Sequence, residues 1–449
     1  MRFGTDGVRG RFGTDLTLDD ARVLGRAVAV VLGPRVATGE VVIGGDTRES
    51  TPLLETAVAD GLASGGLECI ALGVAPTPMV AFTAAQRGAI GIVISASHNP
   101  YHDNGIKVFG PGGTKLDTAT ESAIEAAIDA ERSAGADVAA SVGDHADHGD
   151  HPLVAPARDR YIEHLLGVLE GRRLDSMPIV VDAANGAASS LAAEVLDRAG
   201  AVVTAIHDQP DGRNINVECG ATDPTSLARH VIEHRAVLGV ALDGDADRLI
   251  AVDEHGAVVD GDRIIAICAQ DLRQRQRLAN DTVVVTVMTN LGFHEAMGRA
   301  GIAVVQTPVG DRAVLEAIDA GGHSLGGEQS GHIIFRDHAT TGDGLLTALV
   351  LADVLARSAG PLSQLAADAM DRLPQVLTNV EIAERLDGVD DDLAAQIDAM
   401  AERLGGRGRI LVRPSGTEPL VRVMVEAATD NTAETVAADI AELVRSHLG

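Results

Sequence analysis

Short apolar runs alternate with stretches of helical period along the first three-quarters of the chain. An early example is Val41–Gly44, followed by a helix that begins at Thr51, where a capping threonine precedes a proline. The alternation starts again near residue 155 and once more near residue 255. Strands that are separated by helices tend to pair in parallel within one sheet. Three units of similar length therefore predict three similar α/β domains with mixed, largely parallel sheets.

The last part of the chain follows a different order. From about residue 372 we expect strand, helix, strand, strand and helix, which predicts a smaller C-terminal α+β domain. Helices are also expected at Ala187–Ala199 and Leu291–Ala300, in the second and third domains. The predicted domain limits are 1–155, 156–254, 255–370 and 371–449.

Composition excludes several classes of function. The net charge of −29 argues against general nucleic-acid binding, which needs a basic surface. No apolar run approaches the ~20 residues of a membrane helix, and the first residues lack the apolar core of a signal peptide. The scattered Cys69, Cys219 and Cys268 indicate free buried thiols rather than a disulfide or zinc framework. We therefore expect a cytoplasmic protein.

The segment Ile94–Pro100 carries a hydroxyl and an imidazole, Ser97 and His98, directly after an apolar run. Ligands bind at the carboxyl ends of strands in open α/β sheets. Ser97 could therefore be a covalent nucleophile or a phosphate carrier, provided that a neighbouring group activates it. The alternative is a polar turn, in which proline ends the strand.

Lysine is almost absent from the chain, which holds only Lys107 and Lys115 beside many arginines. Lysine can exchange a proton, whereas arginine is a permanent cation. Lys107, ten residues after Ser97, is therefore a candidate acid/base group. Lys115 follows Gly112-Gly113-Thr114, and we interpret its segment as a plain turn.

Three carboxylates at alternate positions follow the apolar strand that ends at Leu242: Asp243, Asp245 and Asp247. They can converge on one point, and Mg²⁺ prefers oxygen ligands completed by a phosphate oxygen. The alternatives are a solvated acidic turn or a partial calcium loop, but the residues after Arg248 lack the rest of a calcium loop.

Two further glycine-containing segments carry polar groups. Gly326–His332 offers side chains that suit sugar hydroxyls, namely Glu328, Gln329, Ser330 and His332. Arg413–Pro419, with Arg422 beyond it, offers phosphate ligands: Arg413, Ser415, the backbone at Gly416, Thr417 and Arg422. Ordinary surface turns remain the alternative for both segments.

Asp144–Pro152 is the one segment of biased composition, with His145, His148 and His151 between acidic residues. These histidines could hold a metal ion. The stronger interpretation is a solvated linker between the first two domains, since no helix pattern positions the ligands.

Together with the opening Phe3–Gly10, these segments resemble the α-D-phosphohexomutase superfamily over essentially the whole chain. Five motifs stand in the order that this family shows. The opening FGTDGVRG and Gln329 are most similar to the branch that acts on glucosamine phosphate. The chain departs from the usual pattern at Gly45, where arginine is common, and at Ala313, where an aromatic residue is common.

The resemblance implies four domains around a central cleft, each contributing one loop. It makes Ser97 a phosphoserine that binds one Mg²⁺ per chain together with Asp243, Asp245 and Asp247. Lys107 would be the general acid/base, with Arg9 and His98 beside it. The remaining residues would bind substrate: Arg248 positions it, Glu328 and Ser330 hold sugar hydroxyls, and Arg413, Ser415, Gly416, Thr417 and Arg422 hold the non-reacting phosphate.

The implied reaction interconverts glucosamine 6-phosphate and glucosamine 1-phosphate through a 1,6-bisphosphate, and glucosamine 1,6-bisphosphate would also be the activator. The product would supply UDP-N-acetylglucosamine and cell-wall synthesis. The alternatives are a phosphomannomutase or phosphoglucomutase, a metal-dependent phosphatase, and a non-catalytic sugar-phosphate-binding protein. The expected partner is a small phosphosugar, without nucleic acid or membrane, and the expected state is a monomer or homodimer.

Overall fold

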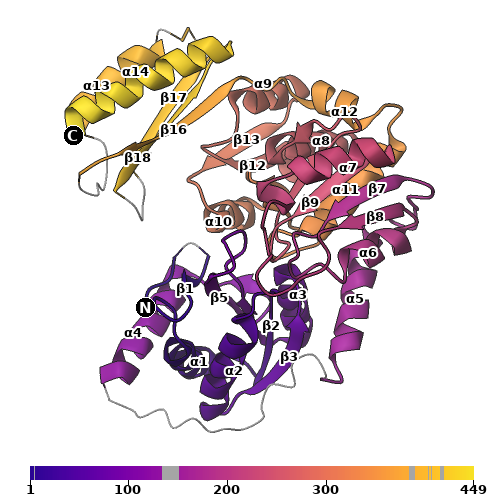
Figure 1. Cartoon of the computed structure of the whole chain (residues 1–449), viewed down its shortest axis with the longest axis vertical. Coiled ribbons are helices and arrows are strands. Elements are labelled where there is room, and N and C mark those ends of the chain that lie inside the picture. Colours follow the sequence, from indigo (N-terminus) through magenta and orange to yellow (C-terminus); the bar gives the residue numbers. More distant parts are fainter. Residues whose placement is uncertain are drawn as a thin grey trace. The chain divides into compact units, whose positions relative to one another are not determined.

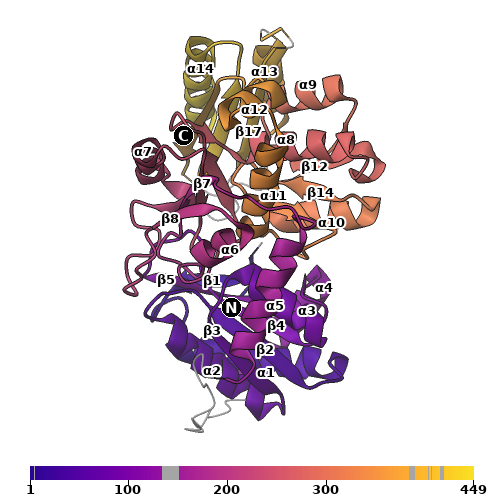
Figure 2. The ribbon, with the colours of Figure 1, turned by 90° about the vertical axis from the view of Figure 1, so that its right-hand side faces the viewer.

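The computed structural model describes residues 1–4, 6–133, 151–383, 390–402, 404–405, 407–414 and 419–448 (Figures 1 and 2). Contacts between residues divide the chain into two compact units. The first comprises Met1–Met288 and Ile302–Ala367, and the second comprises Thr289–Gly301 and Asp368–Gly449. The predicted α/β class is confirmed.

The first sheet of the larger unit has the strand order β1-β5-β4-β2-β3, with β6 paired to β5. Its strands are β1 (Val8–Arg11), β2 (Glu40–Gly45), β3 (Glu68–Val74), β4 (Ile90–Ile94), β5 (Asp103–Gly110) and β6 (Thr114–Lys115). The helices are α1 (Leu18–Leu32), η1 (Gly33–Arg35), α2 (Thr51–Ser64), α3 (Thr77–Arg87) and α4 (Thr118–Ser133). Strands β4, β2 and β3 are parallel, whereas β5 is antiparallel to β4.

Alternate side chains of β2 point to opposite faces of this sheet, and both faces are buried. Val41 and Ile43 lie in one hydrophobic core with α1, α2 and α4. Gly44 faces Val80 of α3 on the other side. Gly45 leaves no room for a larger side chain, because an added Cβ would lie 2.5 Å from Thr51 Cγ2 and 2.7 Å from Ile94 O. Packing therefore explains why arginine does not stand at this position.

The second sheet has the order β11-β10-β9-β7-β8 and the third has the order β13-β12-β14-β15. The second contains β7 (Pro178–Asp182), β8 (Val202–Ile206), β9 (Leu238–Leu242), β10 (Leu249–Val252) and β11 (Val258–Val259), with α5 (Val154–Gly167), α6 (Ala192–Ala199), η2 (Gly220–Thr222) and α7 (Thr225–His234). The third contains β12 (Thr282–Thr286), β13 (Ala303–Thr307), β14 (Leu325–Gly327) and β15 (Ile333–Phe335), with α8 (Gly261–Gln274), η3 (Ala279–Asp281), α10 (Asp311–Gly321), α11 (Gly344–Arg357) and α12 (Leu362–Ala369).

The three sheets share one topology. In each, one central strand (β2, β7 or β12) pairs in parallel with the next two strands of the chain, one on either side. The later of these two (β4, β9 or β14) pairs antiparallel with the strand that follows it (β5, β10 or β15). The loop between the two antiparallel strands therefore occupies the same place in every repeat. These loops are 95–102, 243–248 and 328–332, and they carry three of the motifs that the sequence predicts to be chemical.

The smaller unit contains an antiparallel sheet of order β16-β18-β17. Its elements are β16 (Gln375–Glu381), β17 (Arg409–Pro414), β18 (Leu420–Glu426), α13 (Asp391–Glu402) and α14 (Asp430–Leu448). Val421, Val423 and Val425 alternate along β18 and share a core with Ile440 and Val444 of α14. This agrees with the predicted C-terminal α+β pattern.

Helix α9 (Leu291–Ala300) has the predicted bounds but belongs to the smaller unit rather than to the third sheet. A buried carboxylate joins it to this unit, since Glu426 Oε2 of β18 accepts the Leu291 N–H at 3.1 Å. Asn290 also donates to Leu373 O at 3.0 Å. The predicted domain limits themselves stay predictions.

Helix α6 is shorter than predicted. It begins at Ala192 rather than at Ala187, because residues 187–191 form turns, in which the Ser189 N–H donates to Gly186 O and the Leu191 N–H to Ala188 O. The three cysteines are free, with Cys219 and Cys268 buried and Cys69 half-buried. Within the described ranges, no single helix is long and apolar enough to cross a membrane, although α11 and α12, bent by 99°, meet the criterion of length and composition together.

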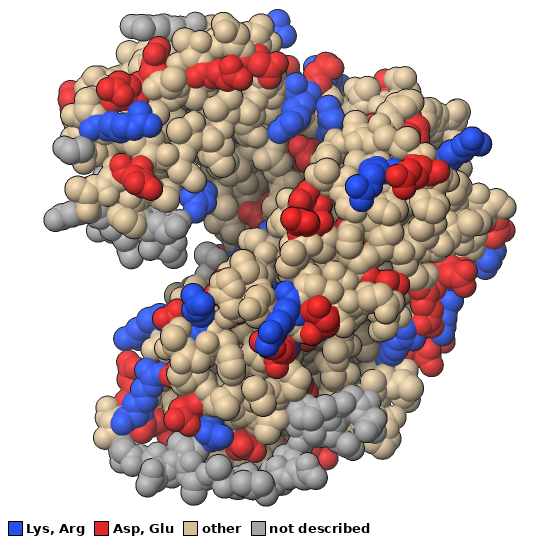
Figure 3. Space-filling model, in the orientation of Figure 1, with Lys and Arg blue, Asp and Glu red and all other residues tan. Residues whose placement is uncertain are grey.

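On the face drawn in Figure 3, the basic side chains of the described residues lie among acidic ones. Ion pairs join helices to the first sheet where Arg87 of α3 pairs with Glu40 of β2 at 2.6 Å and where Asp311 of α10 pairs with Lys115 of β6. The excess of negative charge is therefore spread over this face rather than gathered in one patch.

Candidate active site

The three equivalent loops of the larger unit meet. Ser97 Oγ of the first loop donates to Asp243 Oδ2 of the second at 2.6 Å. Leu249 at the end of the second donates its N–H to Gly331 O of the third at 3.0 Å. A Cβ at Gly331 would lie 2.1 Å from Leu249 O, so only glycine permits this approach. The repeated topology thus brings together motifs separated by more than 140 residues, as in Ser97 and Asp243.

Ser97 is fully buried and held in an uncommon backbone conformation, with φ at 52°. Its N–H donates to Ser95 Oγ at 2.9 Å. Its carbonyl oxygen accepts from Arg48 Nη2 at 3.1 Å and from Asn216 Nδ2 at 3.0 Å. These bonds hold the loop so that the Ser97 hydroxyl points at the carboxylate cluster.

His98 places Nδ1 3.3 Å from Ser97 Oγ. Burial and the cationic Arg248 and Arg9 lower the pKa of His98 to about 4. The imidazole is therefore neutral at neutral pH, and it can accept a proton or a hydrogen bond.

The three aspartates form a buried cluster in which one oxygen from each lies within 4.8 Å of the others. Burial, together with the Asp247 and Asp245 carboxylates, raises the pKa of Asp243 to about 8. Asp245 Oδ1 is buried and has no hydrogen-bond partner among the described residues. An unsatisfied buried carboxylate oxygen between two others is the environment that a divalent cation stabilises. Asp243, Asp245 and Asp247 could hold a metal ion.

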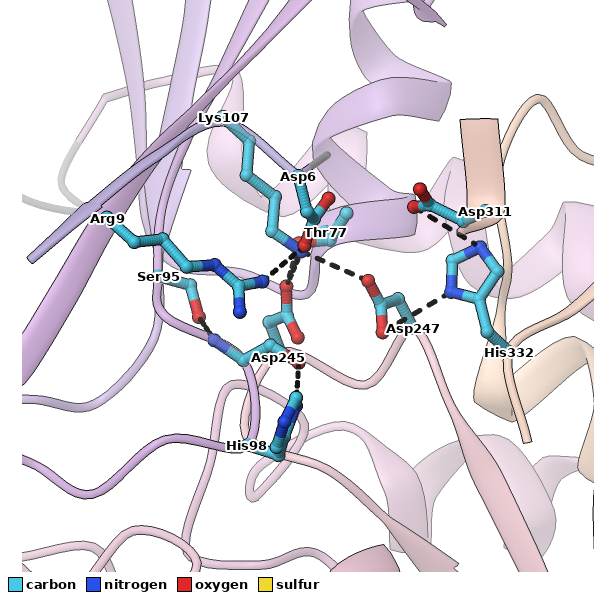
Figure 4. Close-up of polar contacts among 12 residues, drawn as sticks. Asp6, Arg9, Thr77, Ser95, His98, Lys107, Asp245, Asp247, Asp311 and His332 are labelled. Atoms are coloured by element: carbon cyan, nitrogen blue, oxygen red, sulfur yellow. Dashed lines mark hydrogen bonds and ion pairs between the residues drawn. The ribbon is translucent and has the colours of Figure 1, made fainter. Parts of the chain in front are cut away.

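Lys107 of β5 reaches this cluster from the first sheet (Figure 4). Its Nζ lies 2.7 Å from Asp245 Oδ2, 3.1 Å from Asp247 Oδ2 and 2.8 Å from Asp6 Oδ2. Burial lowers the pKa of Lys107, but the carboxylates of Asp245, Asp247 and Asp6 outweigh it and raise the pKa well above its usual value. Lys107 is therefore an ammonium in this arrangement.

Asp6 connects the cationic groups of the first domain. It pairs with Arg9, Lys107 and Lys115. Burial raises the pKa of Asp6, but Lys107, Lys115 and Arg9 lower it well below the ordinary value. The interpretation of Lys115 as part of a plain turn is wrong, since Lys115 lies in β6, is largely buried and also pairs with Asp311 of α10.

On the opposite side, His332 lies between two carboxylates (Figure 4). Its Nδ1 is 3.6 Å from Asp247 Oδ1, and its Nε2 is 3.9 Å from Asp311 Oδ2. Burial raises the pKa of Asp247, but Lys107 and His332 outweigh this effect and hold that pKa well below its ordinary value. Asp247 is therefore ionised.

The predicted sugar ligands lie at the same loops. Arg248 N–H donates to Asp243 Oδ1 at 3.2 Å, and Asp243, Asp247 and Glu328 are among the acidic groups that raise the pKa of Arg248 against the effect of burial. Glu328 Oε1 accepts the Gly310 N–H at 3.1 Å. Ser330 is exposed at the tip of its loop.

The predicted phosphate ligands lie in the smaller unit. Arg413 of β17 and Arg422 of β18 are directly opposite each other in the antiparallel register. Like charges directly opposite each other repel, which an anion bound beside them would offset. Ser415, Gly416 and Thr417 lie outside the described residues, as do His145 and His148 of the proposed linker.

Several residues of the cluster received no role from the sequence: Asp6, which lies in the opening Phe3–Gly10 motif, and Arg48, Thr77, Lys115, Asn216 and Asp311. Thr77, the first residue of α3, donates its N–H to Asp245 O at 3.0 Å and its hydroxyl to Asp245 Oδ2. For Lys115 the sequence does hold a signal, because the rarity of lysine points equally to Lys107 and Lys115. Both lysines bind Asp6.

Family models match all four parts of the chain. They are described as phosphoglucomutase/phosphomannomutase α/β/α domain I over residues 1–135, domain II over 159–256, domain III over 260–373 and the C-terminal domain over 377–443. The chain belongs to the phosphoglucomutase/phosphomannomutase family. The resemblance predicted from the motifs is confirmed, and with it the class of enzyme, a phosphosugar mutase.

Relatives within the family share about half of the sequence. A phosphoglucosamine mutase of Frankia casuarinae is 52% identical over 460 residues, which cover 99% of this chain and 98% of that protein. A phosphoglucosamine mutase of Thermobifida fusca is 50% identical over 451 residues, with the same shares covered.

Solved structures of the family share the fold. A phosphoglucomutase/phosphomannomutase family protein of Burkholderia thailandensis matches with a TM-score of 0.78 and 24% identity over 98% of this chain and 97% of that one. An N-acetylphosphoglucosamine mutase of Aspergillus fumigatus, solved with GlcNAc-6P and magnesium, matches with a TM-score of 0.69 and 21% identity over 100% and 96%.

Proposed function

We propose that this protein is a phosphoglucosamine mutase, an isomerase that interconverts glucosamine 6-phosphate and glucosamine 1-phosphate. The observation that carries the proposal is the buried convergence of Ser97 Oγ, the three aspartates and Lys107. The name shared by relatives that are about 50% identical over nearly the whole chain agrees with it.

The aspartate cluster fits one Mg²⁺ per chain, because Asp245 Oδ1 is buried without a hydrogen-bond partner in the described part of the chain. Asp243, Asp245 and Asp247 would hold the ion, together with an oxygen of a phosphate carried by Ser97. When bound, the cation would offset the negative charge of the transferring phosphoryl group.

The reaction begins with a phosphorylated Ser97. The hydroxyl at C1 of glucosamine 6-phosphate attacks the phosphorus, the bond from phosphorus to Ser97 Oγ breaks, and the proton lost by the sugar hydroxyl is matched by one taken up by Ser97 Oγ. The resulting 1,6-bisphosphate turns over and Ser97 Oγ attacks its 6-phosphate. The bond from phosphorus to O6 then breaks, O6 takes up a proton, and glucosamine 1-phosphate is left. In this second half, the Ser97 hydroxyl loses its proton, and Asp243 Oδ2 and His98 Nδ1 lie at 2.6 and 3.3 Å from Oγ.

Lys107 is proposed as the acid/base group at the sugar hydroxyl. Its ammonium can donate a proton and can neutralise phosphoryl charge. Acting as a base requires that it first lose a proton, which Asp245, Asp247 and Asp6 oppose in the arrangement described. Arg9 also pairs with Asp6 and therefore competes with Lys107 for the Asp6 carboxylate.

The remaining roles are proposals of the same kind. Arg248 would position the substrate, and Glu328 and Ser330 would hold sugar hydroxyls. Arg413, Ser415, Gly416, Thr417 and Arg422 would hold the phosphate that does not react. Glucosamine 1,6-bisphosphate as activator, the central cleft, the cytoplasmic location and a monomeric or homodimeric state also stay predictions.

The test uses purified protein with Mg²⁺ and a trace of hexose 1,6-bisphosphate. Glucosamine 6-phosphate, glucose 6-phosphate and mannose 6-phosphate are followed separately by phosphorus NMR. We expect the amino sugar to be converted fastest to its 1-phosphate, and Ser97→Ala to abolish conversion. Faster turnover of glucose or mannose phosphate would assign the protein to a neutral hexose instead.

Two other results would move the protein out of this enzyme class. Free phosphate as the main product would indicate a metal-dependent phosphatase, in which water attacks instead of the sugar hydroxyl. Binding without conversion, unchanged in Ser97→Ala, would indicate a sugar-phosphate-binding protein.

A further inference from the structure

A second cluster of metal-ligating side chains lies in the second sheet of the larger unit, apart from the three aspartates. Asp182 ends β7, His207 follows β8, and Cys219 precedes η2. One ligand atom from each lies within 4.8 Å of the other two. These are a carboxylate oxygen, an imidazole nitrogen and a thiol sulfur, so the donor set differs in kind from the oxygen-only aspartate cluster.

The imidazole of this cluster lies against the carboxylate. His207 Nδ1 is 3.0 Å from Asp182 Oδ2, an ion-pair distance, and it is buried without another hydrogen-bond partner within the described residues. Nδ1 and the carboxylate oxygen are therefore close enough to be ligands of one metal ion, which would replace the proton between them.

Asp182 retains the capacity to bind a cation. Its Oδ1 accepts the Ala184 N–H at 2.9 Å, and its Oδ2 accepts the Gly220 N–H at 2.9 Å. A carboxylate offers about four lone-pair positions, so these two bonds orient the group and leave further positions for a metal. Asp182 and Cys219 are fully buried, whereas the His207 side chain is 27% exposed and marks the open side of the cluster.

We propose that Asp182, His207 and Cys219 form a zinc site, with a water molecule as the fourth ligand. Thiolate and imidazole donors favour Zn²⁺ over Mg²⁺, and three protein ligands with one open position is a regular zinc arrangement. His207 would bind through Nδ1 and keep its proton on Nε2. None of its ligands contacts Ser97 or the three aspartates in the described contacts, so metal binding here does not require the proposed mutase activity.

Zinc binding at this site would release protons from its ligands. Burial, Asp182 and Asp223 raise the pKa of Cys219 to about 12, so the thiol is protonated in the metal-free protein. The neighbouring Asp182 carboxylate also raises the pKa of His207. Zinc therefore displaces one proton from Cys219, and a second from His207 where that ring is protonated. Affinity consequently rises with pH across the neutral range.

A metal bound by these three residues would fix the position of a segment that contacts the Ser97 loop. The chain from His207 to Cys219 carries Asn216, whose amide donates to Ser97 O at 3.0 Å and to Asn99 O at 3.3 Å. Cross-linking both ends of this segment to β7 would restrict its motion and stabilise the folded state by mass action.

The test titrates the full-length, metal-stripped protein with Co²⁺ in excess Mg²⁺, so that the aspartate cluster is occupied. We expect one equivalent to produce a near-ultraviolet thiolate-to-cobalt charge-transfer band, which oxygen ligands cannot produce, and Zn²⁺ to remove it by competition. Cys219→Ser should lose the band. Cys268→Ser is the matched control and should retain it, because Cys268 is equally buried and belongs to no such cluster among the described residues.

A second variant tests the proposal independently in case Cys219→Ser does not fold. His207→Asn keeps the left-handed backbone angle of 47°, which asparagine adopts readily, and should lose the band or bind Co²⁺ at least about tenfold more weakly. The proposal is overturned if the wild-type protein shows no band, or if the band persists at full affinity in Cys219→Ser or His207→Asn.

Discussion

Arg48 is one of the largest fully buried side chains of the chain, and its position shows what single residues contribute to the site. Its guanidinium pairs with the equally buried Asp46 and donates to Ser97 O at 3.1 Å and to Asn99 O at 2.6 Å. A buried ion pair of this kind adds little net stability, but losing one member leaves a costly unpaired charge. Arg48 therefore positions the serine loop through backbone carbonyls, without contact to Ser97 Oγ in the described contacts.

Arg48→Met should lower the free energy of unfolding by about 3–5 kcal/mol, because Asp46 remains buried without its cation. Chemical denaturation measures this. The double variant Asp46→Asn with Arg48→Met should recover part of the loss. Equal loss in the single and double variants would show that the unpaired Asp46 is not the cause.

Glu55 of α2 gives a pH dependence unrelated to the active site. It is 2% exposed, and burial raises its pKa to about 7 from an ordinary value of 4.5. Between these values the unfolded chain releases a proton that the folded chain keeps, so the contribution of Glu55 to stability is greatest below pH 4.5 and falls as pH rises to 7. The difference is about 3 kcal/mol.

Glu55→Gln should abolish this dependence, because glutamine has no proton to release. Unfolding free energies of the wild type and the variant, compared from pH 4 upward, should diverge in that interval. Parallel curves would mean that the pKa of Glu55 is the same in both states.

At the scale of elements, the crossing of α1 and α2 depends on two glycines. A Cβ at Gly25 would lie 2.3 Å from Val58 O, and a Cβ at Gly61 would lie 2.1 Å from Arg22 O. The obstructing atoms are backbone and cannot rotate away. The helical pattern of the sequence predicts both helices, but it does not predict that they approach this closely.

Gly25→Ala should therefore destabilise the protein by about 1–3 kcal/mol through overpacking, despite alanine's better helix propensity. Gly298→Ala in α9 is the control, since its Cβ would meet nothing within 4 Å and should stabilise the helix by about 0.5–1 kcal/mol. Thermal and chemical unfolding of both variants measure the contrast, and a stable Gly25→Ala would contradict the close packing.

At the scale of the larger unit, the site depends on contacts between sheets rather than on any one sheet. Ser97 comes from the first sheet, while Asp243 and Asn216 come from the second and His332 from the third. The shared topology puts the loops that follow β4, β9 and β14 at the same end of their sheets. Three copies of one arrangement thereby contribute a hydroxyl, the carboxylates and an imidazole to one place.

Asn216→Gly tests whether this contact between sheets positions Ser97. Glycine accepts the left-handed angle of 59° but cannot donate to Ser97 O. Losing such a bond costs about 0.5–1.5 kcal/mol, so kcat should fall up to about tenfold with little change in KM. Val217→Ala, at an exposed neighbouring position, is the control and should leave both constants unchanged. A change confined to KM would assign Asn216 to substrate binding instead.

The sequence by itself determined the strands, the helices and the loops that carry chemistry, because apolar period, caps and glycine act over a few residues. Local pattern was thereby enough to indicate Ser97, Lys107 and the three aspartates. Only the tertiary structure decided what these groups meet. Asp6, Thr77 and Asn216 join the site through contacts more than 100 residues apart in sequence. Asp182, His207 and Cys219 likewise meet only where β7 and β8 end, because pairing of distant strands, not local pattern, sets which side chains share a buried space.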